Sequence, residues 1–392
     1  MHPLYAEALH LFETTRSWRR DFHQHPELGL QEVRTAGIVA AELRALGLEM
    51  ITGMAETGVT ALLAGDHPGP TILLRFDMDA LPIEEETGAP YASLNPGRMH
   101  ACGHDGHVAT GLSVARLLQA HRHEMHGAVQ LVFQPGEEGL NGADRMIQDG
   151  VLEHFHPEHA LALHLWNDRP VGWLGISSGP VMAGSAIFTV TLDGRGGHAA
   201  SPHQTVDPLA AAAQVVTALQ SIVARNLPPL EAGVVSVCQL RAGDAFNVIP
   251  STAELAGTLR WFTPRVKEIL CSRFEQIVRQ TAAAMGCEAA IEITPLTPPV
   301  VNDPALTRRV QATARQVWPE AEIETAYQTM GSEDMAFFND RLPGCFFFVG
   351  SADPARGLAF AHHHPRFDFD EAALPCAAAL LSAAALDLLA EA

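Results

Sequence analysis

The stretch HACGHDGHVATGLSVARLLQ, residues 100–119, sets a dense group of metal-binding side chains directly before an apolar helical pattern. Four of its side chains are candidate ligands, namely Cys102, His104, Asp105 and His107. A thiolate and an imidazole so close together suit zinc and similar divalent ions. The apolar spacing of residues 108–119 predicts a helix that begins just after this group. We therefore expect a metal site where a loop opens into a helix.

Short apolar segments on both sides of this stretch predict the strands of an α/β domain. The predicted strands cover residues 58–64, 71–76, 128–133 and 160–165. Helical spacing covers residues 4–23 and 31–46, which are separated by His25-Pro26. Strands that alternate with helices favour a largely parallel sheet, and such sheets bind ligands at the carboxyl ends of their strands.

A different order of elements begins near residue 185. We predict a strand at 185–192, a helix at 206–224, strands at 234–240 and 253–262, a helix at 266–285 and a strand at 289–293. This βαββαβ order is the ferredoxin-like motif. The first pattern resumes after Pro298-Pro299, with a helix at 303–317 and a strand at 345–349. The expected fold is therefore a discontinuous α/β domain, residues 1–183 and 297–392, with an inserted α+β ferredoxin-like domain, residues 184–296.

The composition is typical of a globular protein with an acidic surface. The 392 residues include 47% hydrophobic residues and carry a net charge of -20 at pH 7, which argues against nucleic acid and anionic membranes as partners. Six cysteines form no CxxC pair and predict reduced thiols in the cytoplasm. The first twenty residues lack a signal-peptide pattern. The apolar stretch 372–390 contains Pro375 and Asp387, so we expect a buried helix and no membrane span.

Further candidate ligands lie at the ends of the predicted strands. Glu137 and Glu138 follow the strand at 128–133, where one carboxylate can bind metal while its neighbour takes a proton from water. His164 lies in the apolar strand at 160–165, and a histidine triplet occupies residues 362–364. Each feature alone has a structural interpretation, such as a core histidine or a solvated acidic pair. Together with the acidic turn at 77–79 they favour a catalytic metal site.

Eight segments in chain order resemble the M20 family of metallopeptidases, specifically its aminoacylase and hippurate hydrolase branch. They are FHQHPEL (22–28), DMDALP (77–82), MHACGHDGH (99–107), QPGEEG (134–139), GGHAASP (196–202), AFNVIP (245–250), MGSED (330–334) and HHPRF (363–367). The resemblance implies a zinc-peptidase-like catalytic domain and an inserted lid domain that also makes a homodimer. It spans nearly the whole chain, so no single motif carries it.

The resemblance implies roles for individual residues. The expected ligands of two divalent ions per subunit are Cys102, His104, Glu138, His164 and His363. Glu137 matches the general base, and Asp79 matches an acidic residue that supports the site. Alignment on Pro365 selects His363 from the triplet. Asp105 and His107 then become residues that orient the ligands, and the metal stays open among zinc, manganese, cobalt and nickel.

The inserted domain is expected to contribute three further residues. His198 and Asn247 match lid residues that reach the reacting carbonyl and the substrate. Arg260 either pairs with a substrate carboxylate or forms a structural salt bridge, and the sequence favours neither. Whether His198 acts in its own subunit or across a dimer also stays open.

The implied activity is the hydrolysis of N-acyl-L-amino acids, hippurate-like or N-acetylated, to a carboxylate and a free amino acid. The alternatives within the family are a dipeptidase, a carboxypeptidase or a deacetylase of the N-acetyl-diaminopimelate type. A non-catalytic binding module is disfavoured, because all five ligand positions and Glu137 are present.

Overall fold

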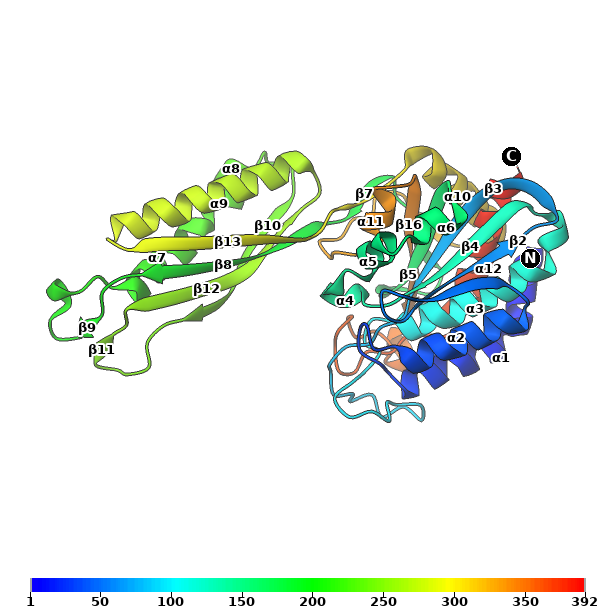
Figure 1. Ribbon diagram of the computed structural model, residues 1–392, viewed down its shortest axis with the longest axis horizontal. Coiled ribbons are helices and arrows are strands. Elements are labelled where there is room, and N and C mark those ends of the chain that lie inside the picture. The colour runs from blue at the N-terminus through cyan, green and yellow to red at the C-terminus, as the bar shows by residue number, and fades with distance from the viewer. Residues whose placement is uncertain (1, 391–392) are drawn as a thin grey trace. The chain divides into compact units, whose positions relative to one another are not determined.

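The computed structural model describes residues 2–390 and divides into two compact units (Figure 1). The large unit contains the chain up to Val181, residues 300–328 and the chain from Asp334 onward. The small unit contains residues 182–299 and 329–333. The discontinuous α/β fold with an α+β insertion is thereby confirmed, while the expected boundaries at 183–184 and 296–297 stay predictions.

An eight-stranded sheet forms the centre of the large unit, in the order β1-β2-β4-β3-β5-β16-β6-β15. Its strands are β1 (Glu49–Met54), β2 (Gly58–Ala64), β3 (His67–Asp77), β4 (His126–Gln134), β5 (His159–Pro170), β6 (Trp173–Gly175), β15 (Glu322–Glu324) and β16 (Gly344–Ala352). The neighbours β4, β3, β5 and β16 run parallel, whereas β1 and β2 add an antiparallel edge. The parallel centre agrees with the apolar runs in the sequence.

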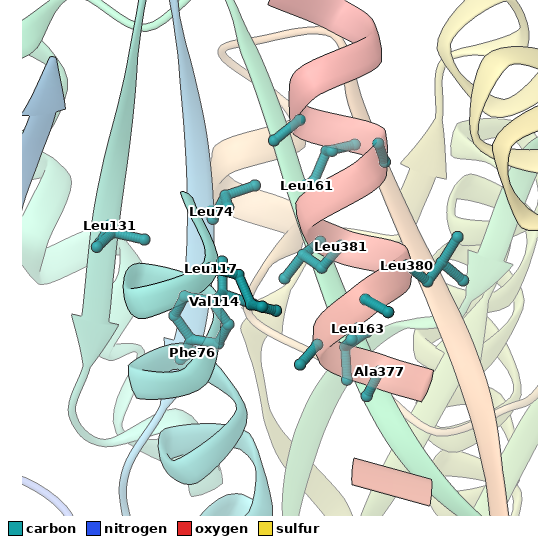
Figure 2. Packing of buried hydrophobic residues seen from close by; sticks show 14 of the residues in the cluster. Leu74, Phe76, Val114, Leu117, Leu131, Leu161, Leu163, Ala377, Leu380 and Leu381 are labelled. Carbon is teal, nitrogen blue, oxygen red and sulfur yellow. The ribbon is translucent and has the colours of Figure 1, made fainter. Parts of the chain in front are cut away.

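Helices cover this sheet, and two of them are the most deeply buried. The helices are α1 (Pro3–Gln24), α2 (Val33–Ala45), α3 (His104–Ala120), α4 (Glu137–Leu140), α5 (Gly142–Gln148), α6 (Val151–Phe155), α10 (Pro304–Val317), α11 (Ala336–Asn339) and α12 (Ala373–Ala390). Figure 2 shows Leu117 of α3 and Leu381 of α12 packed near Leu74 and Leu161 of the sheet. Helix α12 is long and apolar enough to cross a membrane, yet most of it lies inside this core, as expected for a buried helix.

The small unit has the predicted βαββαβ order. Its elements are β8 (Gly184–Asp193), α7 (Pro208–Leu219), α8 (Ser221–Asn226), β10 (Gly233–Arg241), β12 (Thr252–Trp261), α9 (Pro264–Ala284) and β13 (Glu288–Thr297). The four strands form an antiparallel sheet in the order β10-β12-β8-β13 (Figure 1). Two short strand pairs complete the chain: β9 (Gly197–His198) with β11 (Val248–Ile249), and β7 (Gly179–Met182) with β14 (Val300–Asn302).

The single helix predicted at 206–224 is wrong in one respect, since the structure divides it into α7 and α8. Asp207 accepts hydrogen bonds from the backbone N–H groups of Leu209 and Ala210 and so begins α7. The N–H of Gln220 donates to the carbonyl of Thr217, three residues earlier, at 3.3 Å. This tighter turn ends α7. The apolar spacing continues through the turn, so the sequence pattern did not indicate that the helix is divided.

Candidate metal centre

The candidate site lies at the carboxyl ends of neighbouring parallel strands in the large unit. Strand β3 ends at Asp77 and is followed by Asp79, while β4 ends at Gln134 and leads into α4. Strand β5 pairs with β3 up to Ala162 opposite Arg75, which brings His164 level with the end of β3. The arrangement follows the general rule for ligand sites in open α/β sheets.

Among the described residues, five groups of side chains could each hold a metal ion, and three overlapping groups contain the predicted ligands. They are Cys102 with His104 and His164, Cys102 with Glu138 and His363, and His104 with Glu137 and Glu138. Within each group the ligand atoms lie within 4.8 Å of one another. Cys102 Sγ is 3.5 Å from His164 Nε2, and His363 Nε2 is 3.1 Å from Glu138 Oε1. The structure thus brings all five predicted ligands together around Cys102 and Glu138.

The orientation of two imidazoles fits metal binding. His104 Nδ1 donates to the carbonyl of Asp79 at 2.9 Å, which leaves its buried Nε2 with no hydrogen-bond partner among residues 2–390. His164 Nδ1 donates to the carbonyl of Leu165 at 2.7 Å, so that Nε2 faces Cys102. Metal-ligating histidines usually have one nitrogen held by a carbonyl or carboxylate in this way. The donor set therefore fits divalent cations such as zinc.

The electrostatics of the site also favour a cation. Burial opposes the charged form of His104, but Asp77 and the hydrogen bond to Asp79 raise its pKa to about 10. Burial raises the pKa of the Cys102 thiol well above its usual range, and the charges of Glu138 and Glu137 add to the effect. The carboxylates around His104 therefore outweigh its burial, and a bound divalent ion would neutralise their negative charge.

Two of the four residues proposed from the opening stretch have other partners. His107 Nδ1 donates to Asp77 Oδ1 at 2.5 Å, and its Nε2 accepts the N–H of Leu165 at 2.9 Å. Both ring nitrogens are therefore engaged, and His107 has no lone pair left for a metal. Asp105 Oδ2 accepts from Arg19 Nε at 2.9 Å and contacts His23 Nδ1 at 2.7 Å. These contacts suit residues that orient the loop.

The backbone distinguishes the histidines of the triplet. His362 Nε2 donates to the carbonyl of Leu165 at 3.0 Å, and its ring lies against Trp166. His363 has a φ of 67°, a conformation that is costly for a non-glycine residue. Its N–H donates to the carbonyl of Ala101 at 2.7 Å. This bond ties the His363 loop to the Cys102 loop, and it is His363 that reaches Glu138.

A buried network beside Glu137 was missed by the sequence interpretation. Asp334 Oδ1 accepts from Arg75 Nη2 and from Gln134 Nε2, both at 2.8 Å. The N–H of Asp334 lies 3.4 Å from Glu137 Oε1. Asp334 belongs to the segment MGSED, which the sequence interpretation matched to the family without a role. Its partner Arg75 is 259 residues away in the chain, so no local pattern could reveal the pair.

Two of the three candidate residues of the small unit, His198 and Arg260, lie on its strands β9 and β12, and Asn247 lies in the turn directly before β11. His198 pairs with Val248 across β9 and β11, and the N–H of Ala199 donates to the carbonyl of Asn247 at 3.1 Å. His198 Nδ1 accepts the N–H of Ala200 at 3.0 Å, which leaves Nε2 as the hydrogen-bond donor of the neutral ring.

Arg260 has a hydroxyl partner. Its Nη1 donates to Ser332 Oγ at 2.6 Å, and among the described residues no carboxylate lies within ion-pair distance of the guanidinium. Burial lowers the pKa of Arg260. Within residues 2–390, the structural salt bridge that was one alternative for Arg260 is therefore not formed.

Comparison with known proteins places these observations in a family. The sequence pattern described as Peptidase family M20/M25/M40 matches residues 73–387. The chain belongs to this family. It is a hydrolase that acts on amide bonds and binds metal, and the five clustered side chains are the candidate ligands.

Similar members of the family come from plants and bacteria. The chain is 37% identical to IAA-amino acid hydrolase ILR1-like 2 of Arabidopsis thaliana, over 99% of this chain and 88% of that protein. It is 38% identical to N-acetylcysteine deacetylase of Bacillus subtilis, over 92% of both chains. The crystal structure of the Bacillus subtilis YXEP protein, a dinuclear metal binding peptidase from the M20 family, superposes with a TM-score of 0.84. It shares 33% identity over 97% of this chain and 98% of that one.

Proposed function

We propose that this protein is a metal-dependent amidohydrolase that cleaves N-acyl-L-amino acids to a carboxylate and a free amino acid. The observation that carries the proposal is the position of Glu137 among the clustered ligands, within 4.8 Å of the ligand atoms of His104 and Glu138. The names of the relatives support the substrate class, because an acyl amino acid is what an N-acetylcysteine deacetylase and an IAA-amino acid hydrolase act on.

Five side chains would hold two divalent ions, and they are Cys102, His104, Glu138, His164 and His363. When bound, such ions polarise a carbonyl and acidify water, and zinc and manganese are the first candidates. Asp79 supports this set from two directions. Its carbonyl orients His104, and its Oδ2 accepts the N–H of Glu138 at 2.9 Å.

Glu137 handles the proton in the proposed reaction. Its carboxylate takes a proton from the attacking water and passes it to the leaving nitrogen of the amide. The N–H of Asp334, 3.4 Å from Glu137 Oε1, orients this carboxylate. The network of Arg75 and Gln134 in turn fixes Asp334.

The small unit supplies groups that bind the substrate. His198 donates from Nε2 to the oxygen that becomes negative during attack, which is where a fixed donor stabilises the transition state most. Asn247 binds the amide, and the planar guanidinium of Arg260 binds the carboxylate of the amino acid. We further propose a cytoplasmic homodimer formed through this lid unit, with His198 acting in its own subunit or in the partner's.

A substrate panel tests the proposal on protein reconstituted with zinc, manganese, cobalt or nickel. We expect hydrolysis of hippurate or N-acetyl amino acids to exceed that of dipeptides and N-acetyl-diaminopimelate, measured by the release of free amine. Faster cleavage of dipeptides would favour the peptidase alternative. Absence of turnover with every substrate and metal would refute the amidohydrolase assignment.

A further inference from the structure

Glu32 is a buried carboxylate with no role in the reaction described above. It lies in the segment Glu27 to Glu32, between α1 and α2, and its side chain is fully buried. A charged side chain is rarely found in such a position unless it is paired. No cation pairs with Glu32 among residues 2–390, so its hydrogen bonds must account for its presence.

The two carboxylate oxygens bind two different loops. Oε1 accepts the N–H of Gly136 at 2.9 Å, and Oε2 accepts the hydroxyl of Thr57 at 2.6 Å. Gly136 immediately precedes Glu137 and has a φ of 60°. Glu32 therefore holds the peptide that leads into the proposed base, at a point where the chain turns through a left-handed conformation.

The same segment contacts the base loop from a second position. A Cβ atom on Gly29 would meet Leu140 Cδ1 at 2.7 Å and Gly136 Cα at 3.1 Å, so the two backbones lie in close contact. The N–H of Ala80 donates to the carbonyl of Glu27 at 2.8 Å. The segment thus supports both the loop that carries Glu137 and the one that carries Asp79.

A purely structural role does not require a carboxylate here. Burial raises the pKa of Glu32 to about 7, despite the opposing hydrogen bond from Thr57. Keeping the charged form buried therefore costs free energy, and a neutral side chain of the same size would fill the space at lower cost. What a neutral apolar side chain lacks is an acceptor for the N–H of Gly136.

We propose that Glu32 is a positioning residue for the hydrolysis, which directs the carboxylate of Glu137 by holding the Gly136 peptide. The inference rests on the proposed role of Glu137 as the base. Its test compares Glu32→Met, which keeps the volume but removes the acceptor, with Glu32→Gln, whose amide oxygen still accepts an N–H. Glu27→Met is the matched control, because the carboxylate of Glu27 accepts the N–H groups of Arg34 and Thr35, whereas the N–H of Gly136 binds Glu32.

The kinetic expectation follows from misplacement of a general base. Glu32→Met should lower kcat by about 10- to 100-fold, with KM and metal content little changed. Glu32→Gln should restore kcat to within about 3-fold of the wild type, because the hydrogen bond to Gly136 is retained. Glu27→Met should keep kcat near the wild-type value. A kcat for Glu32→Met equal to that of the control would overturn the proposal.

Hydrogen–deuterium exchange gives a readout that needs no activity. The backbone amides of residues 136–142 should exchange at least about 10-fold faster in Glu32→Met than in the wild type and in Glu27→Met. If Glu32→Met does not fold, Thr57→Val removes the hydroxyl that holds Oε2 and should show smaller changes of the same sign. Unchanged exchange in a folded variant refutes the positioning role. If the wild type cleaves no substrate while exchange responds as expected, the proposed function fails and the contact stands.

Discussion

Replacing Glu32 by glutamine should make the folded protein more tolerant of alkaline pH. Burial raises the pKa of Glu32 from its ordinary value of 4.5 to about 7. Between these values the folded state binds the proton more tightly than the unfolded chain does. The stability that depends on this proton is fully present below pH 4.5 and is lost as the pH rises through 7. A pKa difference of this size corresponds to about 3 kcal/mol of stability. The wild type loses this stability at alkaline pH, whereas Glu32→Gln has no carboxyl group to titrate and keeps its stability.

The assay is thermal denaturation of both proteins at pH 5 and pH 8. A chelator keeps them free of divalent metal, because metal binding itself changes with pH. The Tm of Glu32→Gln minus that of the wild type should be larger at pH 8 than at pH 5, by roughly 3–5 °C for about 2.5 kcal/mol in a chain of 392 residues. Glu27→Gln removes a partly exposed carboxylate from the same segment and serves as the control. An equal Tm difference at both pH values would refute the reasoning.

Three further predictions concern the site and its supports. Glu137→Gln should retain its metal and lose about 10²- to 10⁴-fold in kcat; wild-type turnover in the metal-loaded variant would rule out Glu137 as the base. Cys102→Ser should weaken metal binding, which metal analysis of the purified protein measures; full loading would remove Cys102 from the ligands. Arg19→Met removes the guanidinium that pairs with the buried carboxylates of Asp105 and Asp368 and should destabilise the fold by about 3–5 kcal/mol, and an unchanged Tm would contradict this.

Much of the fold could be predicted from apolar patterns alone. Strands β3, β4 and β5 are buried runs of apolar residues, and β8 alternates between buried and exposed positions. The short outer strands β1, β6 and β15 were not predicted. Only one of the six residues of β1 is buried, so it offers no such run, and the other two strands have only three residues each.

The sequence could likewise predict only part of the candidate site. Cys102 and His104 are close in sequence, His164 and the triplet 362–364 were candidates from their positions near strand ends, and the resemblance to a family selected His363 from the triplet. Contacts between distant segments had no local signature. Glu32 and Gly136 are 104 residues apart, and their hydrogen bond depends on how the loops fold against each other. Secondary-structure propensities and the spacing of residues describe neighbours along the chain, so they cannot predict hydrogen bonds between such distant residues.

The peptide groups of Leu165 couple the site to the register of the sheet. The N–H binds His107, and the carbonyl binds both His164 and His362. Because backbone atoms make these bonds, an alanine scan at position 165 would measure packing against the neighbouring Gly106 and would leave the imidazole contacts untested. A slip of β5 by one residue would instead misalign all three rings at once. The orientation of these three imidazoles therefore depends on the correct pairing of β5 with its neighbours. A list of the side chains in the site would not show this dependence.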